Sequence, residues 1–247
     1  MALRFDDHRA YVTLDRPDKH NGLTVDMLSG LIASARTIAR RSDVRAVILS
    51  GNGPSFSSGL DIAAATSNPL AIARNFVPRP WRGTNAFQEA CWAWRRLPVP
   101  VIAAVHGRCY GGGLQLALAA DFRFATPDAE FSVMETKHGL VPDMTGAATL
   151  SRLIGIDKAL LLTMTADTVD AAYAAKIGLV TELAADPVAE AGKLADRLAT
   201  RSPHAVAAAK RLLEKSWQAS ARRTFAVERA TQLPLILRKA LGRSEGR

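Results

Sequence analysis

Two glycine-rich turns, each placed directly after a short apolar run, constrain the fold of this chain more than any other feature. The first run, Val44–Leu49, leads into Ser55–Ile62, which contains Gly59. The second run, Val101–Val105, leads into His106–Gly113, which ends in three consecutive glycines. Short β-branched runs that end in turn residues predict buried strands. We therefore predict an α/β fold in which a strand, a glycine turn and a helix form a repeated unit.

The remainder of the chain is predicted to be mainly helical, with a few short strands. Thr24 is expected to cap a first helix that reaches about Arg41, because the apolar residues after it recur with helical spacing. Beyond Gly146 the chain is alanine-rich, so the α/β core is expected to be followed by a helical C-terminal part. The other predicted helices are Asn85–Arg96, Gly111–Ala120, Ala147–Ile154, Lys158–Met164, Val169–Lys176, Val188–Thr200 and His204–Trp217, and the other short strands are Ala10–Leu14, Phe122–Ala125 and Phe131–Met134.

Prolines mark two places where regular structure is not expected. Residues 62–82 show no clear period and contain Pro69, Pro78 and Pro80, so we predict an irregular segment there. Near the C-terminus, Pro234 is expected to break a helix, because proline lacks the N–H that a helix interior needs.

The composition is that of an ordinary globular protein in a reducing compartment. The 247 residues are 48% hydrophobic and 22% charged, which is enough apolar material for a core. No apolar run is long enough to span a bilayer and the N-terminus lacks the apolar stretch of a secretory signal, so we expect a cytoplasmic protein without a membrane partner. Two cysteines, Cys91 and Cys109, are too few for a disulfide framework, and no metal site is expected.

The formal net charge of +9 indicates an attraction to polyanions. The partner could be nucleic acid or the phosphates of a nucleotide-type cofactor. The basic residues are scattered in short pairs such as Arg40-Arg41 and Arg222-Arg223, and no basic tract is interleaved with aromatic residues. This pattern argues against nucleic acid as the partner.

The two glycine turns suit an anionic oxygen. Glycine lets the backbone bend sharply and approach a ligand, and the first residues of a helix have free N–H groups. Neither turn has the lysine of a phosphate loop, the spacing of a dinucleotide fingerprint or the Gly-x-Ser-x-Gly of a nucleophile elbow. Taken singly, each turn could equally be a closely packed turn without a ligand.

The order of the motifs closely resembles the crotonase (enoyl-CoA hydratase/isomerase) superfamily. The motifs are Arg16-Pro17 with Asn21, Phe-Ser-Ser-Gly-Leu-Asp-Ile at 56–62, Pro-Val-Ile-Ala-Ala-Val-His-Gly at 100–107 before the three glycines, Ala-Asp-Phe-Arg at 120–123 and Phe-Ser-Val-Met-Glu at 131–135. The resemblance covers roughly residues 10–217. It implies a spiral core of ββα units over residues 1–190 and a helical C-terminal trimerisation region over residues 191–247.

The same resemblance implies CoA thioester substrates and a homotrimer or dimer of trimers. CoA is then part of the substrate, and no permanently bound cofactor is expected. The backbone amides of Leu60 and Gly112 are implied to form an oxyanion hole for the thioester carbonyl. Ala63 stands where some relatives have a lysine near the CoA phosphates. The residues implied to line the CoA site are Lys19, His20, Ser58, Leu60, Asp61, Ile62 and Gly112, of which the first two match more loosely.

Hydratases of this family use two glutamates for acid–base chemistry, and only one has a counterpart here. Glu135, at the end of the last motif, matches one of them and is the expected base. The other position is Gln115, an amide that can orient a water but cannot take its proton. Asp143 lies where some isomerases of the superfamily have an aspartate, and its alternative role is the N-cap of the next helix.

These residues predict an acyl-CoA enzyme that moves a proton at the carbon beside an enolate-like thioester. With Glu135 and Asp143 as its carboxylates, double-bond isomerisation is the preferred reaction, and hydration of 2-enoyl-CoA is the alternative. A non-catalytic acyl-CoA-binding protein is the alternative of another class, because Gln115 lacks basicity. His106 is expected to make a structural hydrogen bond, and His138 is expected near the pocket.

Overall fold

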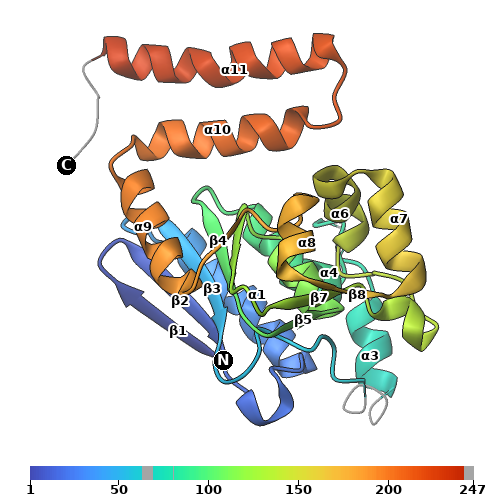
Figure 1. Ribbon diagram of the computed structural model, residues 1–247. Helices are drawn as coiled ribbons and strands as arrows, with labels where there is room; N and C mark the ends of the chain where they lie inside the picture. Colours follow the sequence, from blue (N-terminus) through green and yellow to red (C-terminus); the bar gives the residue numbers. More distant parts are fainter. Residues whose placement is uncertain (63–68, 80, 242–247) are drawn as a thin grey trace.

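The computed structural model describes residues 1–62, 69–79 and 81–241 (Figure 1). Within these residues, a six-stranded sheet has the order β1-β2-β3-β4-β6-β9, and a smaller sheet has the order β5-β7-β8. β1 runs antiparallel to β2, whereas every later neighbour in the larger sheet is parallel. The strands are β1 Ala2–Asp6, β2 Arg9–Leu14, β3 Ala46–Gly51, β4 Val101–Val105, β5 Arg108–Tyr110, β6 Phe122–Ala125, β7 Glu130–Ser132, β8 Thr168–Asp170 and β9 Glu182–Leu183.

Helices follow the strands and dominate the C-terminal half. Thr24 caps the first of them by accepting the N–H of Met27 at 3.2 Å, and Asn85 with Gln88 forms a capping box on α4. The helices are α1 Val25–Ala39, α3 Pro69–Phe76, α4 Ala86–Arg95, α5 Gly112–Leu118, α6 Gly146–Ile154, α7 Ile156–Thr165, α8 Ala171–Lys176, α9 Pro187–Ala199, α10 Pro203–Ser216 and α11 Ala221–Ala240, with the single turns η1 Pro17–Lys19 and η2 Glu135–His138.

The side chains of β3 and β4 divide the core between the two faces of the larger sheet. Val47 and Leu49 belong to the cluster that contains α1 and α4, whereas Ile48 packs with Ala191 of α9. Successive residues of a strand point to opposite faces, so helices cover the sheet on both sides. α10 and α11 lie side by side and extend away from the sheet (Figure 1).

Most of the predicted elements are confirmed, and three of the predictions are wrong. The strands Val101–Val105 and Phe122–Ala125 have the predicted bounds. Part of the segment predicted to be irregular forms α3, while residues 63–68 and 80, and with them Ala63, lie outside the described residues. Val169 was predicted to be helical but lies in β8, which pairs with β7.

The prediction that Pro234 breaks a helix is also wrong, because α11 continues through it. A proline inside a helix leaves the carbonyl four residues earlier, here that of Ala230, without its usual donor. Ala230 is exposed and α11 has no buried residue, so water can take the place of that donor.

The expected division into residues 1–190 and 191–247 stays a prediction. Its boundary falls within α9, whose Ala191 and Ala195 are buried against the sheet. In the described part of the chain, no helix is both long and apolar enough to cross a membrane.

Candidate active site

The two glycine turns lie side by side at the ends of the parallel neighbours β3 and β4. Ser57 donates its backbone N–H to the carbonyl of Arg108, and Tyr110 donates to that of Ser57, both at 3.0 Å. Gly59 has a φ of +97°, and a Cβ added there would lie 2.9 Å from the Tyr110 oxygen. Backbone contacts therefore hold the turns together, and glycine is required where they touch.

The N–H groups of Leu60 and Gly112, which we call the amide pair, come close in this arrangement. A Cβ added to Gly112 would lie 3.5 Å from the nitrogen of Leu60, and one added to Gly59 would lie 3.4 Å from the nitrogen of Gly112. Gly112 is the first residue of α5, so the helix does not use its N–H. Within the described residues, neither N–H is donated to a protein acceptor. The amide pair can therefore donate to one external oxygen that carries negative charge.

The residues predicted to line the CoA site surround the first turn. Ser58 donates its N–H to the carbonyl of His20 at 2.8 Å, and its hydroxyl lies 3.4 Å from the carbonyl of Lys19. Asp61 accepts a hydrogen bond from Arg16 at 2.6 Å. The segment before α1 is thereby joined to the turn that carries Leu60. The predicted residues brought together here are Lys19, His20, Ser58, Leu60, Asp61, Ile62 and Gly112.

Asn21 holds this region together, a role that its place in the Arg-Pro-…-Asn motif did not by itself predict. It is fully buried, accepts the N–H of Arg16 at 2.7 Å, and donates to the carbonyls of Asn52 at 2.8 Å and Ser55 at 2.7 Å. Its φ of +53° lies in the left-handed region, which asparagine tolerates. The Arg-Pro-…-Asn motif was the signal for this role, but the partners Asn52 and Ser55 lie more than 30 residues away in the chain.

Glu135 opens η2 and lies against the second glycine turn. A Cβ added to Gly111 would lie 3.6 Å from its Oε1, and Gly111 directly precedes Gly112 of the amide pair. Oε1 accepts a hydrogen bond from Nε2 of Gln115, whereas the buried Oε2 has no partner within the described residues. Burial raises the pKa of the Glu135 carboxyl above its usual 4.5, and the charge of Asp143 adds to the rise. Oε2 can therefore accept a proton, and the carboxyl group lies beside the glycine that precedes the amide pair.

Gln115 is fixed from both ends of its amide group. Its Oε1 accepts the backbone N–H groups of Met144 and Gly146, each at 2.8 Å. Because the oxygen faces these two donors, the nitrogen is the atom that faces Glu135. The side chain is only 2% exposed. Gln115 thus ties Glu135 to the loop that begins α6, and it offers no carboxylate that could deprotonate water.

Asp143 lies on that same loop, close enough to Glu135 for its charge to affect the pKa of the glutamate. The alternative prediction that Asp143 caps the next helix is wrong, since Thr145 precedes α6 and no side chain caps it. Burial raises the pKa of the Asp143 carboxyl above its usual 3.8. Burial, and then the charges of Asp143 and Glu135, raise the pKa of the Cys91 thiol, so α4 also borders this region. We call Glu135 and Asp143 the carboxyl pair.

The two histidines occupy the positions that the sequence suggested. Nε2 of His106 lies 2.9 Å from the carbonyl oxygen of Gly53, which confirms its structural hydrogen bond. His138 is exposed, and its charge lowers the pKa of Glu135. Cys91 and Cys109 are buried and unpaired, and the described residues contain no group of three His, Cys, Asp or Glu that could hold a metal ion.

Comparison with known sequences gives a consistent result. The family model described as enoyl-CoA hydratase/isomerase matches residues 5–240. YngF of Bacillus subtilis, whose name carries the same designation, is 34% identical over 90% of this chain and 84% of its own length. The mitochondrial Delta(3,5)-Delta(2,4)-dienoyl-CoA isomerase of Rattus norvegicus is 35% identical over 82% of this chain. The chain spans only 64% of that isomerase, which is less than two thirds.

Solved structures have the same fold. An enoyl-CoA hydratase from Bacillus anthracis superposes with a TM-score of 0.86 at 27% identity, over 95% of this chain and 90% of the other. A Thermobifida fusca protein in complex with CoA has a TM-score of 0.85 at 32% identity, over 97% and 93% of the two chains. The predicted fold class, an α/β spiral core with a helical C-terminal region, is confirmed.

Proposed function

This chain belongs to the enoyl-CoA hydratase/isomerase family, and from that premise we propose that it isomerises the double bond of an enoyl-CoA thioester. The observation that carries the proposal is the hydrogen bond from Gln115 to Glu135. This bond occupies one oxygen of Glu135 and leaves the other without a partner in the described part of the chain. It also places an amide where a hydratase would need a second base to activate water. A base that moves a proton between two carbons needs no such partner.

The amide pair supplies the electrostatic part of the proposed reaction. Loss of a proton from C2 of the acyl group builds negative charge on the thioester oxygen, and two fixed N–H donors stabilise that charge. Removal of one donor of this kind typically costs about 3 kcal/mol of transition-state stabilisation. Since both donors belong to the backbone, the side chain of Leu60 is free to vary.

The carboxyl pair supplies the acid–base part. Oε2 of Glu135 takes the C2 proton of a 3-enoyl thioester, and the electron pair of that C–H bond becomes part of a dienolate. Return of a proton to C4, from Glu135 or Asp143, forms the C2=C3 bond and consumes the C3=C4 bond. The raised pKa values of both carboxyls favour this role, because a carboxylate whose pKa is raised is a stronger base toward the C2 proton.

Recognition of the CoA part is proposed for the segment around the first turn, with Lys19, His20, Ser58, Asp61 and Ile62. A Thermobifida fusca relative with the same fold is known in complex with CoA, and another structure from that organism holds acetoacetyl-CoA at a TM-score of 0.82 and 32% identity. CoA then enters as part of the substrate. No resident cofactor is needed for the proposed proton transfer.

Hydration of 2-enoyl-CoA is the second candidate, favoured by the proximity of Asp143 to Glu135. In this case Asp143, on the loop before α6, would activate the water in place of the second glutamate that hydratases of the family have. The two candidates differ in one respect that can be tested. Hydration requires a base for water, and isomerisation requires only a base for carbon.

A homotrimer or dimer of trimers is proposed as the assembly. α11 has no buried residue, yet its exposed side chains include Phe225, Leu233, Ile236 and Leu237. Large apolar side chains on one exposed helix indicate a covered surface in the functional assembly. Light scattering at micromolar concentration is expected to give three or six chains, and a monomer would contradict the proposal.

The decisive experiment is a comparison of substrates. The protein is incubated with 3-enoyl-, dienoyl- and 2-enoyl-CoA thioesters, and products are followed by absorbance and mass spectrometry. We expect isomerisation to be faster than the gain of water by 2-enoyl-CoA. Rapid hydration that survives the change Gln115→Ala would instead support Asp143 as a second base and the hydratase alternative.

A further inference from the structure

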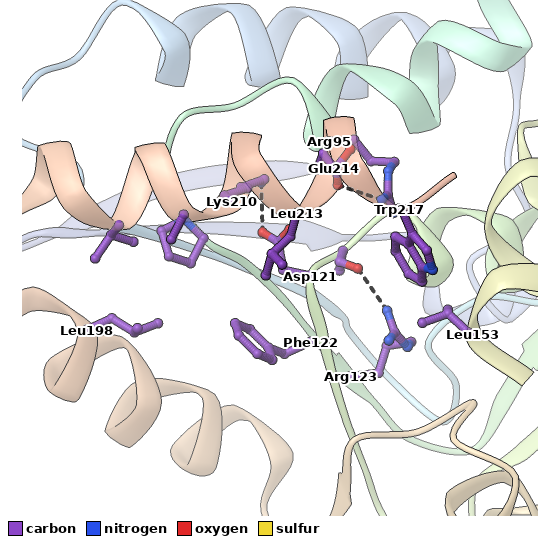
Figure 2. Close-up of a pocket in the computed structure, with 14 residues that line it drawn as sticks. Arg95, Asp121, Phe122, Arg123, Leu153, Leu198, Lys210, Leu213, Glu214 and Trp217 are labelled. Carbon is purple, nitrogen blue, oxygen red and sulfur yellow. Dashed lines mark hydrogen bonds and ion pairs between the residues drawn. The ribbon is translucent and has the colours of Figure 1, made fainter. Parts of the chain in front are cut away.

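A cavity outside the candidate active site lies between α10, α9 and β6 (Figure 2). Its volume is about 360 Å³, within the range of pockets that hold small organic ligands. Most of its wall is hydrocarbon, contributed by Phe122, Leu153, Leu198, Leu213 and Trp217. Its ligand should therefore have an apolar body.

Charged side chains also line this cavity, and the positive charges outnumber the negative ones. Three cations, Arg95, Arg123 and Lys210, are accompanied by two carboxylates, Asp121 and Glu214. Lys210 pairs with Asp121 at 2.7 Å, and Arg95 pairs with Glu214 at 2.5 Å (Figure 2). One positive charge is left in excess among the lining residues.

Arg123 carries that excess charge, because no carboxylate in the described part of the chain forms an ion pair with it. It is 3% exposed and donates to two backbone carbonyls, Ala120 at 2.8 Å and Leu179 at 2.8 Å. Burial lowers the pKa of Arg123 to about 10. The negative charge of Asp121 raises this pKa and the positive charge of Arg95 lowers it further. Because a pKa of about 10 is well above 7, the guanidinium is charged at neutral pH. A buried charge without a counterion is costly, and an anion in the cavity removes that cost.

Arg95 has an unused donor beside the same space. It is 8% exposed, and its Nε has no hydrogen-bond partner although the atom is fully buried. Buried N–H groups are nearly always paired in native proteins, so an unpaired one next to a cavity indicates a missing acceptor. A carboxylate provides such an acceptor, and arginine binds carboxylates with strong charge-assisted hydrogen bonds.

We propose that this cavity is a binding site for a medium-chain carboxylic acid, with the carboxylate beside Arg95 and Arg123 and the hydrocarbon chain along Phe122, Leu198 and Leu213. A single negative charge matches the excess in the wall, and an alkyl chain matches the apolar remainder. The occupied cavity joins α10 to β6, so the ligand ties the C-terminal helices to the sheet.

Isothermal titration of the full-length protein with decanoate tests the site. We expect one saturable site per chain, binding at least about tenfold weaker for decanol, and the same affinity for decanoate in the presence of saturating acetoacetyl-CoA. The last comparison separates this site from the proposed active site. Absence of saturable binding, equal affinity for decanol, or competition by the thioester would each overturn the proposal.

Two variants on α10 form a matched pair. Ala209 lines the cavity and is exposed, so Ala209→Phe should fill the space and abolish decanoate binding without unfolding the helix. Ala205 is exposed on the same helix but does not line the cavity, so Ala205→Phe should bind as the wild type does. Unchanged binding in Ala209→Phe would place the acid elsewhere. A second copy of the chain is the other possible occupant of the cavity, and light scattering on Ala209→Phe tests it. If the wild type binds no acid and Ala209→Phe no longer assembles, the cavity belongs to a contact between copies of the chain.

A charge variant completes the test. Arg95→Gln removes one of the two cations proposed to hold the carboxylate and should weaken decanoate binding at least about tenfold while leaving decanol binding unchanged. Lys193→Met, at an exposed ion pair on α9, removes one positive charge from the surface and should change neither. If Arg95→Gln does not fold, the comparison of decanoate with decanol and the two alanine variants still decides the outcome.

Discussion

The amide pair and the carboxyl pair lie next to each other, but the chain holds them in different ways. Leu60 and Gly112 are positioned by backbone hydrogen bonds between two turns that end neighbouring parallel strands. Glu135 and Asp143 depend on a single side chain, since Gln115 bonds Glu135 with one end of its amide and the α6 loop with the other. Backbone geometry therefore sets the first half of the site, and side-chain chemistry sets the second.

Because of this difference, the amide pair and the carboxyl pair should respond to different kinds of substitution. The amide pair should tolerate a change of most side chains and fail when a glycine gains a Cβ, because contacts there are as short as 2.9 Å. The carboxyl pair should respond to the chemistry of each side chain even when the backbone does not move. The proposed function needs both halves, so each can be disabled or altered alone.

The largest effect is expected from Glu135→Gln, which removes the proposed base and keeps its shape. Exchange of the C2 proton of an acyl-CoA for deuterium should fall by about 100- to 10,000-fold, the usual contribution of a general acid–base group. Binding of the thioester should survive, since the amide pair is untouched. Mass spectrometry of the recovered thioester measures the exchange, and titration measures the binding. Exchange at the wild-type rate would show that Glu135 is not the base.

The next effect tests the amide pair through its backbone. Gly59→Ala places a Cβ 2.9 Å from the Tyr110 oxygen and 3.4 Å from the Gly112 nitrogen, so the two turns must move apart. Loss of oxyanion stabilisation should lower kcat by about 100- to 1,000-fold. Steady-state kinetics of isomerisation measure the loss.

Gly83→Ala is the control for this variant. Gly83 also has a positive φ, +68°, but an added Cβ there meets nothing within 4 Å. Both variants should lose a similar amount of stability from the left-handed backbone, about 1–2 kcal/mol. An equal fall in kcat for the two would mean that backbone strain, and not the amide pair, explains the effect.

The sequence predicted the first half of the site better than the second, and the reason is physical. Val101–Val105 is a run of buried residues between turns, and such a run specifies a parallel strand almost by itself. The glycine turns then follow from chain order. The bonds of Gln115 reach Met144 and Gly146, which lie 29 and 31 residues further along, so no local pattern reveals them.

Local sequence patterns also failed to predict two elements, the helix α3 and the strand β8. α3 begins at Pro69, and proline is acceptable in the first turn of a helix although it usually signals a break. β8 is three residues long and exists because it pairs with β7, more than 30 residues earlier. Short elements whose stability comes from a distant partner leave little trace in their own residues.

Gln115→Glu is expected to shift the reaction toward hydration. One oxygen of the new carboxylate can keep the N–H groups of Met144 and Gly146, and the other then faces Oε1 of Glu135, where an N–H donor stood before. Two carboxylates so close share a proton, which raises one pKa and creates a pair able to pass a proton between water and carbon. Hydration of 2-enoyl-CoA should rise about tenfold or more.

Gln115→Met is the control, since it is similar in length and has no basic atom. This variant should not increase the rate of hydration of 2-enoyl-CoA. If both variants hydrate as the wild type does, Gln115 does not limit the reaction, and the preference for isomerisation loses its main support.

The smallest effect concerns the pH dependence of proton exchange at C2, which needs only Glu135 in its carboxylate form. Because burial raises the pKa of Glu135, the rate should fall on the acid side at a pH above 4.5. The charge of Asp143 adds to that rise, so Asp143→Asn should lower the pKa and move the acid limb to lower pH. His138 acts in the opposite direction, so His138→Gln should move the limb to higher pH. Exchange rates measured from pH 4 to 9 in the three proteins decide the matter. Shifts of the same sign in both variants would show that the limb reports a conformational change and not the titration of Glu135.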